Sequence, residues 1–120
     1  MSAEKTVLDW TTGNAGIAFQ RCRDCKGQWY FHRDFCPRCG RSGPKSVQAS
    51  GRGVVHALTR VHRAPTEALR AHAPYTIVLV DAEEGFRLMA HGAPELAIGD
   101  AVQARFVPLD DSLIPYFERT

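Results

Sequence analysis

Two pairs of cysteines constrain the fold of this 120-residue chain more than any other feature. The pairs are Cys22-Arg-Asp-Cys25 and Cys36-Pro-Arg-Cys39; ten residues separate them, and the chain has no other cysteine. Two such turns, joined by a short hairpin, can place four thiolates around one small cation, and Zn²⁺ takes sulfur ligands at about 2.3 Å in a tetrahedron. The spacing therefore predicts a metal site built from Cys22, Cys25, Cys36 and Cys39.

All four coordination positions of such a site are filled by protein, so water and substrate have no place on the metal and a structural role is expected. Iron is the alternative to zinc, because Cys36-Pro-Arg-Cys-Gly40 is also the sequence of a rubredoxin knuckle. Rubredoxins carry a longer insertion between their pairs, which favours zinc. Disulfides are disfavoured because residues 1–20 show no export signal, and a thioredoxin-type pair is disfavoured because no helical period follows either pair.

Charge is distributed unevenly along the chain, although the formal net charge is only +2. Residues 1–50 hold eight Lys and Arg against four Asp and Glu, whereas residues 51–120 hold seven against nine. Four thiolates outweigh the charge of one Zn²⁺, so the basic excess of the first half is expected to compensate the metal site. The residues assigned this role, which would also lower thiol pKa values, are Arg21, Arg23, Lys26 and Arg38.

The first 49 residues are predicted to form an N-terminal extension and a metal module. The extension, residues 1–16, has one expected helical stub at Thr6–Trp10, which nearby glycines end. The metal module, residues 17–49, is expected to hold two short strands, and it is too small to outweigh its chain entropy without the metal. The aromatic residues expected to pack over the metal are Trp29, Tyr30, Phe31 and Phe35.

The turn after each cysteine pair has its own backbone requirement. Gly40 follows the second pair, where a positive φ lets backbone N–H groups point at the thiolates. The first pair has Lys26 at the corresponding position and Gly27 one place later. A positive φ at Lys26 would cost about 1 kcal/mol, which a metal-stabilised turn can tolerate.

Residues 50–120 are predicted to form a small barrel. Turn signals at Glu83–Gly85 and Ile98–Asp100 separate strand-like runs, and a short helix is expected within Gly92–Ala97. Five strands that close on themselves match a barrel of OB type, so the predicted fold class is mainly β, with an N-terminal rubredoxin-like zinc ribbon followed by a five-stranded OB-fold barrel. The expected strands are Val54–Val61, Tyr75–Asp81, Phe86–Ala90, Ala101–Val107 and Leu113–Phe117.

A series of short motifs in the metal module and the barrel carries a family resemblance. The motifs lie in order over residues 17–118 and resemble those of the DUF35 family, whose members combine a zinc ribbon with an OB-fold. Such a series is far more specific than four cysteines alone. The motifs are Gln20–Cys25, Trp29–Phe31, Cys36–Gly40, Ser50–Val54, Val61–Pro65, Pro74–Tyr75, Pro108–Asp111 and Ile114–Phe117.

The resemblance implies a non-catalytic accessory subunit. Proteins of the DUF35 family are similar in pairing with thiolase-fold enzymes that form or break carbon–carbon bonds in acyl-CoA substrates, in reactions of thiolase, aldolase or acyltransferase type. The resemblance therefore predicts a hetero-oligomer in which this chain docks on a thiolase-like subunit and helps to bound the CoA site. The CoA thioester is then shared with the partner, which selects the acyl group.

Three cationic or titratable residues, Arg60, His62 and Arg63, are assigned to the CoA side. They lie at the end of the first barrel strand, before a predicted loop that runs from Pro65 to Pro74. Cationic side chains at such a place can meet phosphate groups. No Ser/His/Asp or Cys/His constellation accompanies them, so catalysis by this chain alone is not expected.

Binding of single-stranded nucleic acid is the alternative function, because zinc ribbons and OB-folds both serve it. Such a barrel normally offers a basic groove with stacking aromatics, whereas the barrel segment here is net acidic and most of its aromatics fall at predicted core positions. The longest apolar run, Tyr75–Val80, is far shorter than the ~18 residues of a membrane span. We expect a cytoplasmic protein that contacts no membrane.

Overall fold

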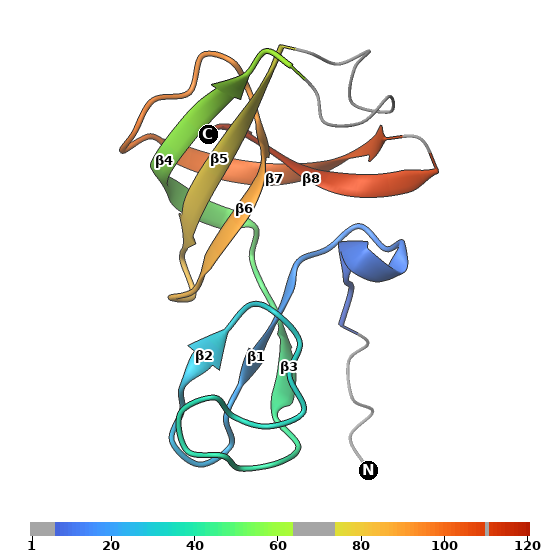
Figure 1. The fold of residues 1–120 in the computed structure, drawn as a ribbon, viewed down its shortest axis with the longest axis vertical. Helices are drawn as coiled ribbons and strands as arrows, with labels where there is room; N and C mark the ends of the chain where they lie inside the picture. The colour runs from blue at the N-terminus through green and yellow to red at the C-terminus, as the bar shows by residue number, and fades with distance from the viewer. Residues whose placement is uncertain (1–6, 64–73, 110) are drawn as a thin grey trace.

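Two modules, one stacked above the other, make up the computed structural model, which describes residues 7–63, 74–109 and 111–120 (Figure 1). The molecule measures 46 × 31 × 25 Å, and its long axis passes through both modules. In chain order, the elements are the 3₁₀ turn η1 (Trp10–Thr12) and the strands β1 (Ala18–Arg21), β2 (Gln28–Trp29), β3 (Lys45–Gln48), β4 (Arg52–Val61), β5 (Tyr75–Ala82), β6 (Arg87–Gly92), β7 (Ala101–Leu109) and β8 (Ser112–Arg119).

The ribbon module is a three-stranded antiparallel sheet in the order β2-β1-β3. The central strand β1 places Gln20 opposite Trp29 on one side and opposite Ser46 on the other. Two short strands were predicted in this module without bounds, whereas the structure has three, of which β3 is the hardest to recognise in the sequence. Its residues are mostly exposed and polar, so they lack the apolar alternation that indicates a strand in the sequence.

The helical turn of the N-terminal segment is η1, which begins four residues later than Thr6–Trp10. Asp9 caps this turn, because its Oδ1 accepts a hydrogen bond of 3.0 Å from the backbone N–H of Thr11. Gly13 ends it with a φ of 89°. The prediction counted Asp9 as part of the helix, although a short acidic side chain favours the position before one. Residue 6 lies outside the described residues.

The barrel is closed, with the strand order β4-β5-β6-β8-β7. Two pairings close it: Gly53 of β4 lies opposite Val102 of β7, and β6 runs parallel to β8 with His91 opposite Tyr116. The structure therefore confirms the predicted OB-type barrel and all five expected strands, whose bounds agree within two residues. Within the described ranges, no helix is long and apolar enough to cross a bilayer.

The link between the third and fourth barrel strands contains turns and no helix, which differs from the prediction for Gly92–Ala97. Gly92 already belongs to β6, so only a few residues remain before the next turn. The backbone N–H of Leu96 donates to the Ala93 carbonyl at 3.3 Å, and the Leu96 side chain is buried. The segment thus covers the end of the barrel without a helix.

One hydrophobic core extends from the barrel into the ribbon. Along β5, alternate residues point inward, and Val78 and Val80 are fully buried. Phe19 of the ribbon stacks on Phe86 of the barrel with ring centroids 4.6 Å apart, and Tyr30 stacks on Phe86 at 5.7 Å. We call these three rings the aromatic joint, because they bury the contact between the two modules.

The turn between β5 and β6 reinforces the aromatic joint with hydrogen bonds. The side chain of Gln28 in the ribbon donates to the Glu84 carbonyl at 2.7 Å, and the Ser50 N–H of the linker donates to Glu84 Oε2 at 2.7 Å. Gly85 has a φ of 100°, as the predicted hairpin turn requires. The turn therefore contacts the ribbon, the linker and the barrel together.

Candidate functional site

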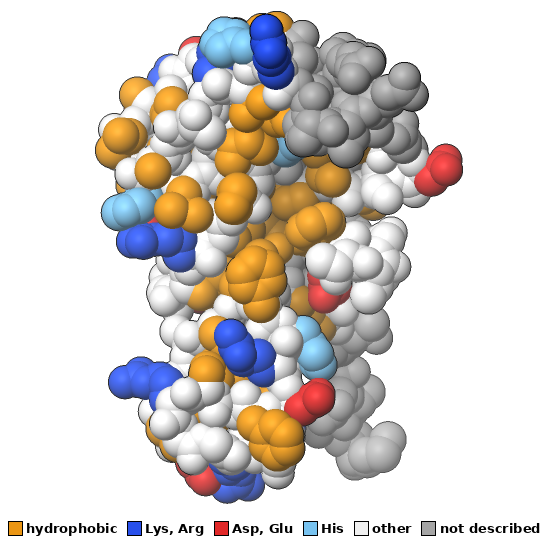
Figure 2. All heavy atoms as spheres, viewed as in Figure 1, with side chains coloured by type: hydrophobic (Ala, Val, Ile, Leu, Met, Phe, Trp, Pro, Cys, Tyr) orange, Lys and Arg blue, Asp and Glu red, His pale blue; other side chains and the backbone are white. Residues whose placement is uncertain are grey.

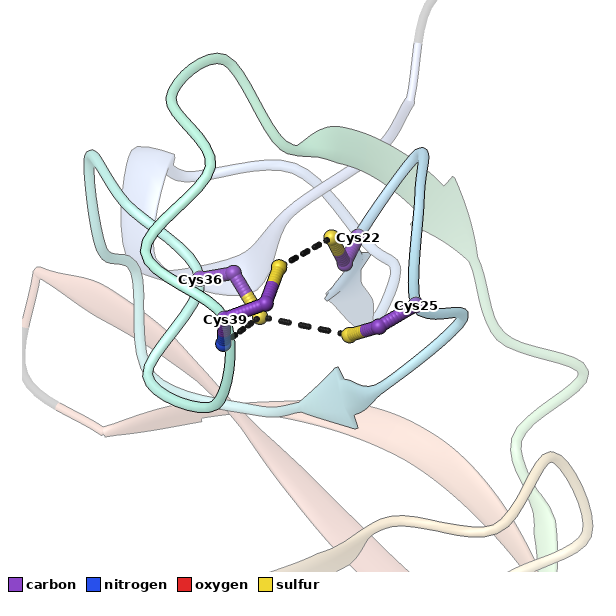
Figure 3. A group of neighbouring side chains, drawn as sticks. All are labelled: Cys22, Cys25, Cys36 and Cys39. Carbon is purple, nitrogen blue, oxygen red and sulfur yellow. Dashed lines mark hydrogen bonds between the residues drawn. The ribbon is translucent and has the colours of Figure 1, made fainter.

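The four cysteine side chains converge on one point between the two turns of the ribbon (Figure 3). The Sγ atoms all lie within 4.8 Å of one another, and the Cys22–Cys39 and Cys25–Cys36 separations are 3.4 and 3.6 Å. A tetrahedron with metal–sulfur bonds of about 2.3 Å has sulfur atoms about 3.8 Å apart. The sulfur positions therefore fit a tetrahedral ion of this size.

Backbone N–H groups in the two turns point at the sulfur atoms. The N–H of Asp24 lies 3.4 Å from Cys22 Sγ, and the N–H of Arg38 lies 3.4 Å from Cys36 Sγ. The residue after each pair has the expected left-handed backbone, with φ of 79° at Gly40 and 64° at Lys26. Among the described residues, Lys26 is the one residue other than glycine with a positive φ, as the sequence predicted for this turn.

The thiols of Cys36 and Cys39 have pKa values shifted in opposite directions. Burial raises the pKa of Cys36, but the N–H groups of Cys39 and Arg38 and the neighbouring thiols outweigh burial and lower this pKa to about 6. The Arg41 N–H lowers the pKa of Cys39, but sharing of its proton with Cys22 and burial prevail and raise this pKa to about 11. A cation at the centre takes the place of the shared protons, so metal binding releases them.

Arg41 is a charged neighbour of the site that the sequence analysis did not assign. Its Nη1 lies 2.5 Å from Asp24 Oδ1, and this contact raises the pKa of Arg41, with further contributions from the charges of Cys22 and Cys39. The sequence could have indicated this role, because Arg41 follows the second cysteine pair by two residues. Three of the basic residues that were predicted to compensate the thiolates make side-chain hydrogen bonds to oxygen atoms. These bonds join Arg21 to Gln28, Arg23 to Gly43 and Lys26 to Arg23.

The aromatic residues of the ribbon do not pack over the metal site as predicted. Tyr30 belongs to the aromatic joint, while Phe31 and Phe35 have 77% and 60% of their surface exposed. The Trp29 indole N–H donates to Gln20 Oε1 at 2.6 Å, so a side chain of β1 holds the polar edge of this ring. The prediction was wrong for Tyr30 because the barrel, a separate part of the chain, supplies the apolar surface on which its ring packs.

Of the three residues assigned to the CoA side, the structure brings Arg60 to a cavity. This cavity has a volume of about 380 Å³ and lies at one end of the barrel, where residues of all five barrel strands line it. Arg105, whose guanidinium lies 4.8 Å above the Tyr116 ring, lines it as well. His62 and Arg63 follow β4 as exposed residues and are not among its described lining. The predicted loop between Pro65 and Pro74 falls almost entirely outside the described residues.

A four-cysteine ribbon followed by a closed five-stranded barrel defines a class of two-module proteins in which a zinc ribbon precedes an OB-fold. The family model for the C-terminal OB-fold domain of ChsH2 matches residues 46–107, just over half of this chain. A DUF35 domain-containing scaffold protein of Methanocaldococcus jannaschii is 33% identical over 80% of this chain and 74% of its own length. The chain belongs to the DUF35 family.

Further relatives extend the similarity to nearly the whole chain. A DUF35 domain-containing scaffold protein of Methanothermobacter thermautotrophicus is 29% identical over 93% of this chain and 92% of its own length. The solved structure of an Ltp2–ChsH2(DUF35) aldolase matches with a TM-score of 0.75 and 30% identity, over 87% of this chain and 84% of that chain. A DUF35 protein of Sulfolobus solfataricus shares the fold, with a TM-score of 0.57, 14% identity and coverage of 88% and 76%.

Proposed function

We propose that this chain is an accessory subunit that docks on a thiolase-fold enzyme, which forms or cleaves a carbon–carbon bond in an acyl-CoA substrate. The observation that carries the proposal is the match to the Ltp2–ChsH2(DUF35) aldolase over most of the chain. The name of that protein joins a DUF35 chain to an aldolase, and the two archaeal relatives are named scaffold proteins. The thiolase fold of the partner rests on the family resemblance.

The metal site supports a scaffolding role for the ribbon. All four cysteines lie in the cluster, so none remains as a nucleophile, and four thiolates leave no open position on the ion. We propose that Zn²⁺ occupies the cluster and stabilises the ribbon. Elemental analysis should find one zinc per chain in a colourless protein, whereas iron would give visible absorbance.

The barrel cavity supports a role on the CoA side, because Arg60 and Arg105 both line it. An Arg–phosphate contact is charge-assisted and contributes roughly 1.5–3 kcal/mol, so Arg60→Gln should raise the KM of the complex for acyl-CoA about tenfold or more. Arg87→Gln is the control, since Arg87 lies on the outer barrel face against Asp81. Equal KM values for the two variants would show that Arg60 does not contribute to binding of acyl-CoA.

Recovery of a partner from the native lysate tests the docking itself. Tagged protein should retain a thiolase-fold enzyme that mass spectrometry identifies, and adding the chain should change the activity or solubility of that enzyme. Failure on both counts would contradict the proposal. A salt-sensitive shift of a single-stranded oligonucleotide at micromolar protein would favour nucleic-acid binding instead.

A further inference from the structure

A narrow apolar groove lies on the ribbon beside η1. Its volume is about 240 Å³, and its walls include Trp10 of η1, Phe19 of β1, and Tyr30 and Phe31 of the segment after β2. In Figure 2, hydrophobic side chains continue from the barrel across the waist of the molecule onto the ribbon. The groove is smaller than the roughly 300–1,000 Å³ of small-molecule sites, and it is of a size to receive one large side chain.

The indole, phenol and amide groups around the groove are already hydrogen-bonded within the chain. The Trp10 indole N–H donates to the Tyr30 hydroxyl at 2.7 Å, which joins the two walls. Gln20 Oε1 accepts from the Trp29 indole and from the Arg33 N–H, and Gln20 Nε2 lies 3.1 Å from His32 Nδ1. Since these groups need no further partner, the groove presents its apolar surface to a ligand.

The same hydrogen bonds fix the exposed position of Phe31. Both neighbours of Phe31 are held, Tyr30 by the aromatic joint and His32 by Gln20, and the Arg33 backbone is also tied to Gln20. These contacts hold the backbone on both sides of Phe31, and 77% of the Phe31 surface is exposed. An exposed aromatic ring that lines a groove and stands on a well-held backbone has the properties of an interface hot spot.

Charge narrows the choice of occupant. Among the described residues that line the groove, Asp9 is the one carboxylate, and none is Lys or Arg. Asp9 Oδ1 also receives hydrogen bonds from Thr11, which hold the carboxylate at the rim. An apolar side chain in the groove with a basic side chain beside Asp9 would match both features.

We propose that this groove is the docking site for the partner enzyme, and that it receives an apolar side chain flanked by a basic residue. The proposal rests on the proposed accessory function and assigns it a surface. It places the main contact on the ribbon, next to the joint with the barrel. The metal would then hold Phe31 in place for the partner without touching it.

The test compares variants of the full-length, zinc-loaded chain in binding to the thiolase-fold enzyme recovered with the wild type. Phe31→Ala should weaken binding at least tenfold, because it removes an aromatic contact at the centre of the surface. Phe35→Ala is the matched control: it is in the same module, is 60% exposed and does not line the groove, so its affinity should stay within about twofold of the wild type. Zinc content and circular dichroism establish that both variants are folded.

Charge is tested with Asp9→Asn, which keeps an N-cap side chain for η1 and removes the carboxylate. Binding should weaken about threefold at low salt, and the difference should disappear at high salt. Unchanged affinity of Phe31→Ala, or equal losses in Phe31→Ala and Phe35→Ala, would overturn the assignment of the groove as the docking site. The proposed accessory function would still stand. Absence of any thiolase-fold partner for the wild type would overturn both proposals.

Discussion

Lys26 occupies a left-handed backbone position that glycine fills in the second cysteine turn. Its φ of 64° costs the folded state roughly 1–2 kcal/mol for a residue with a Cβ. Glycine removes this strain, but it loses about 0.5–1 kcal/mol more conformational entropy on folding. Lys26→Gly should therefore stabilise the zinc-loaded protein by about 0.5–1 kcal/mol. Denaturant unfolding measures the gain, and a loss of stability would mean that the hydrogen bond from Lys26 Nζ to Arg23 matters more than the strain.

Gly40 offers the reciprocal change in the other turn. A Cβ at Gly40 would meet no atom within 4 Å, so the effect of Gly40→Ala is conformational alone. With a φ of 79°, it should destabilise the protein by about 1 kcal/mol, opposite in sign to Lys26→Gly. Similar unfolding midpoints for Gly40→Ala and the wild type would show that the metal overrides backbone strain in both turns.

Asp100 gives the barrel a defined response to acid. It accepts hydrogen bonds from Arg119 at 2.7 Å and from the Ala97 N–H at 2.9 Å, and these contacts hold its pKa below the ordinary value of 3.8. Its contribution to stability is therefore fully present above 3.8 and is lost as the pH falls through the lower pKa of the folded state.

The measurement compares the wild type with Asp100→Asn in denaturant unfolding across the acidic range. The variant should be less stable at neutral pH, and the difference in stability should shrink once the wild-type carboxyl is protonated. Both proteins release metal in acid, so the barrel signal in far-ultraviolet circular dichroism is the one to follow. A difference that stayed constant into strong acid would contradict the assigned pKa shift.

At the scale of elements, the β5–β6 hairpin couples the two modules through Phe86. This ring is 6% exposed and stacks on rings from the ribbon, so Phe86→Ala should cost about 3–5 kcal/mol. Phe86→Leu retains most of the volume and should cost about 1 kcal/mol. Phe35→Ala removes an exposed ring and serves as the control in the same unfolding experiment. A loss no larger than that of Phe35→Ala would mean that the aromatic joint contributes little.

The elements differ in how far the sequence could predict them. Strand β5 alternates buried and partly exposed residues between two turns, so its local pattern was sufficient. Strand β3 is polar and exists because β1 pairs with it, which no local pattern indicates. The same distinction holds for the site. The metal cluster could be predicted because the cysteine spacing is local, whereas the contact between Tyr30 and Phe86 joins residues 56 positions apart. The groove beside η1 depends on such distant contacts and could not be predicted.

At the scale of the whole molecule, the ribbon has two sources of stability, the cysteine cluster and the aromatic joint. A metal bound by the four cysteines would fix the two cysteine turns, while the joint fixes β1 and the segment after β2 against the barrel. The barrel closes through its own strand pairs and does not need the ribbon to complete its sheet. Loss of metal should therefore unfold part of the molecule rather than all of it.

Removal of the metal by a chelator tests this division. Trp10 and Trp29 are the only tryptophans and both precede the barrel, so their fluorescence reports on η1 and the ribbon, while far-ultraviolet circular dichroism also follows the barrel strands. We expect the fluorescence to change at once, because the ion supplies stability that the small core of the ribbon lacks. The barrel should keep its β-sheet signal with a lower unfolding midpoint, since Phe86 loses its stacking partners. Cys36→Ser should reach the same state in the presence of zinc. Simultaneous loss of both signals on chelation would show instead that ribbon and barrel form one cooperative unit.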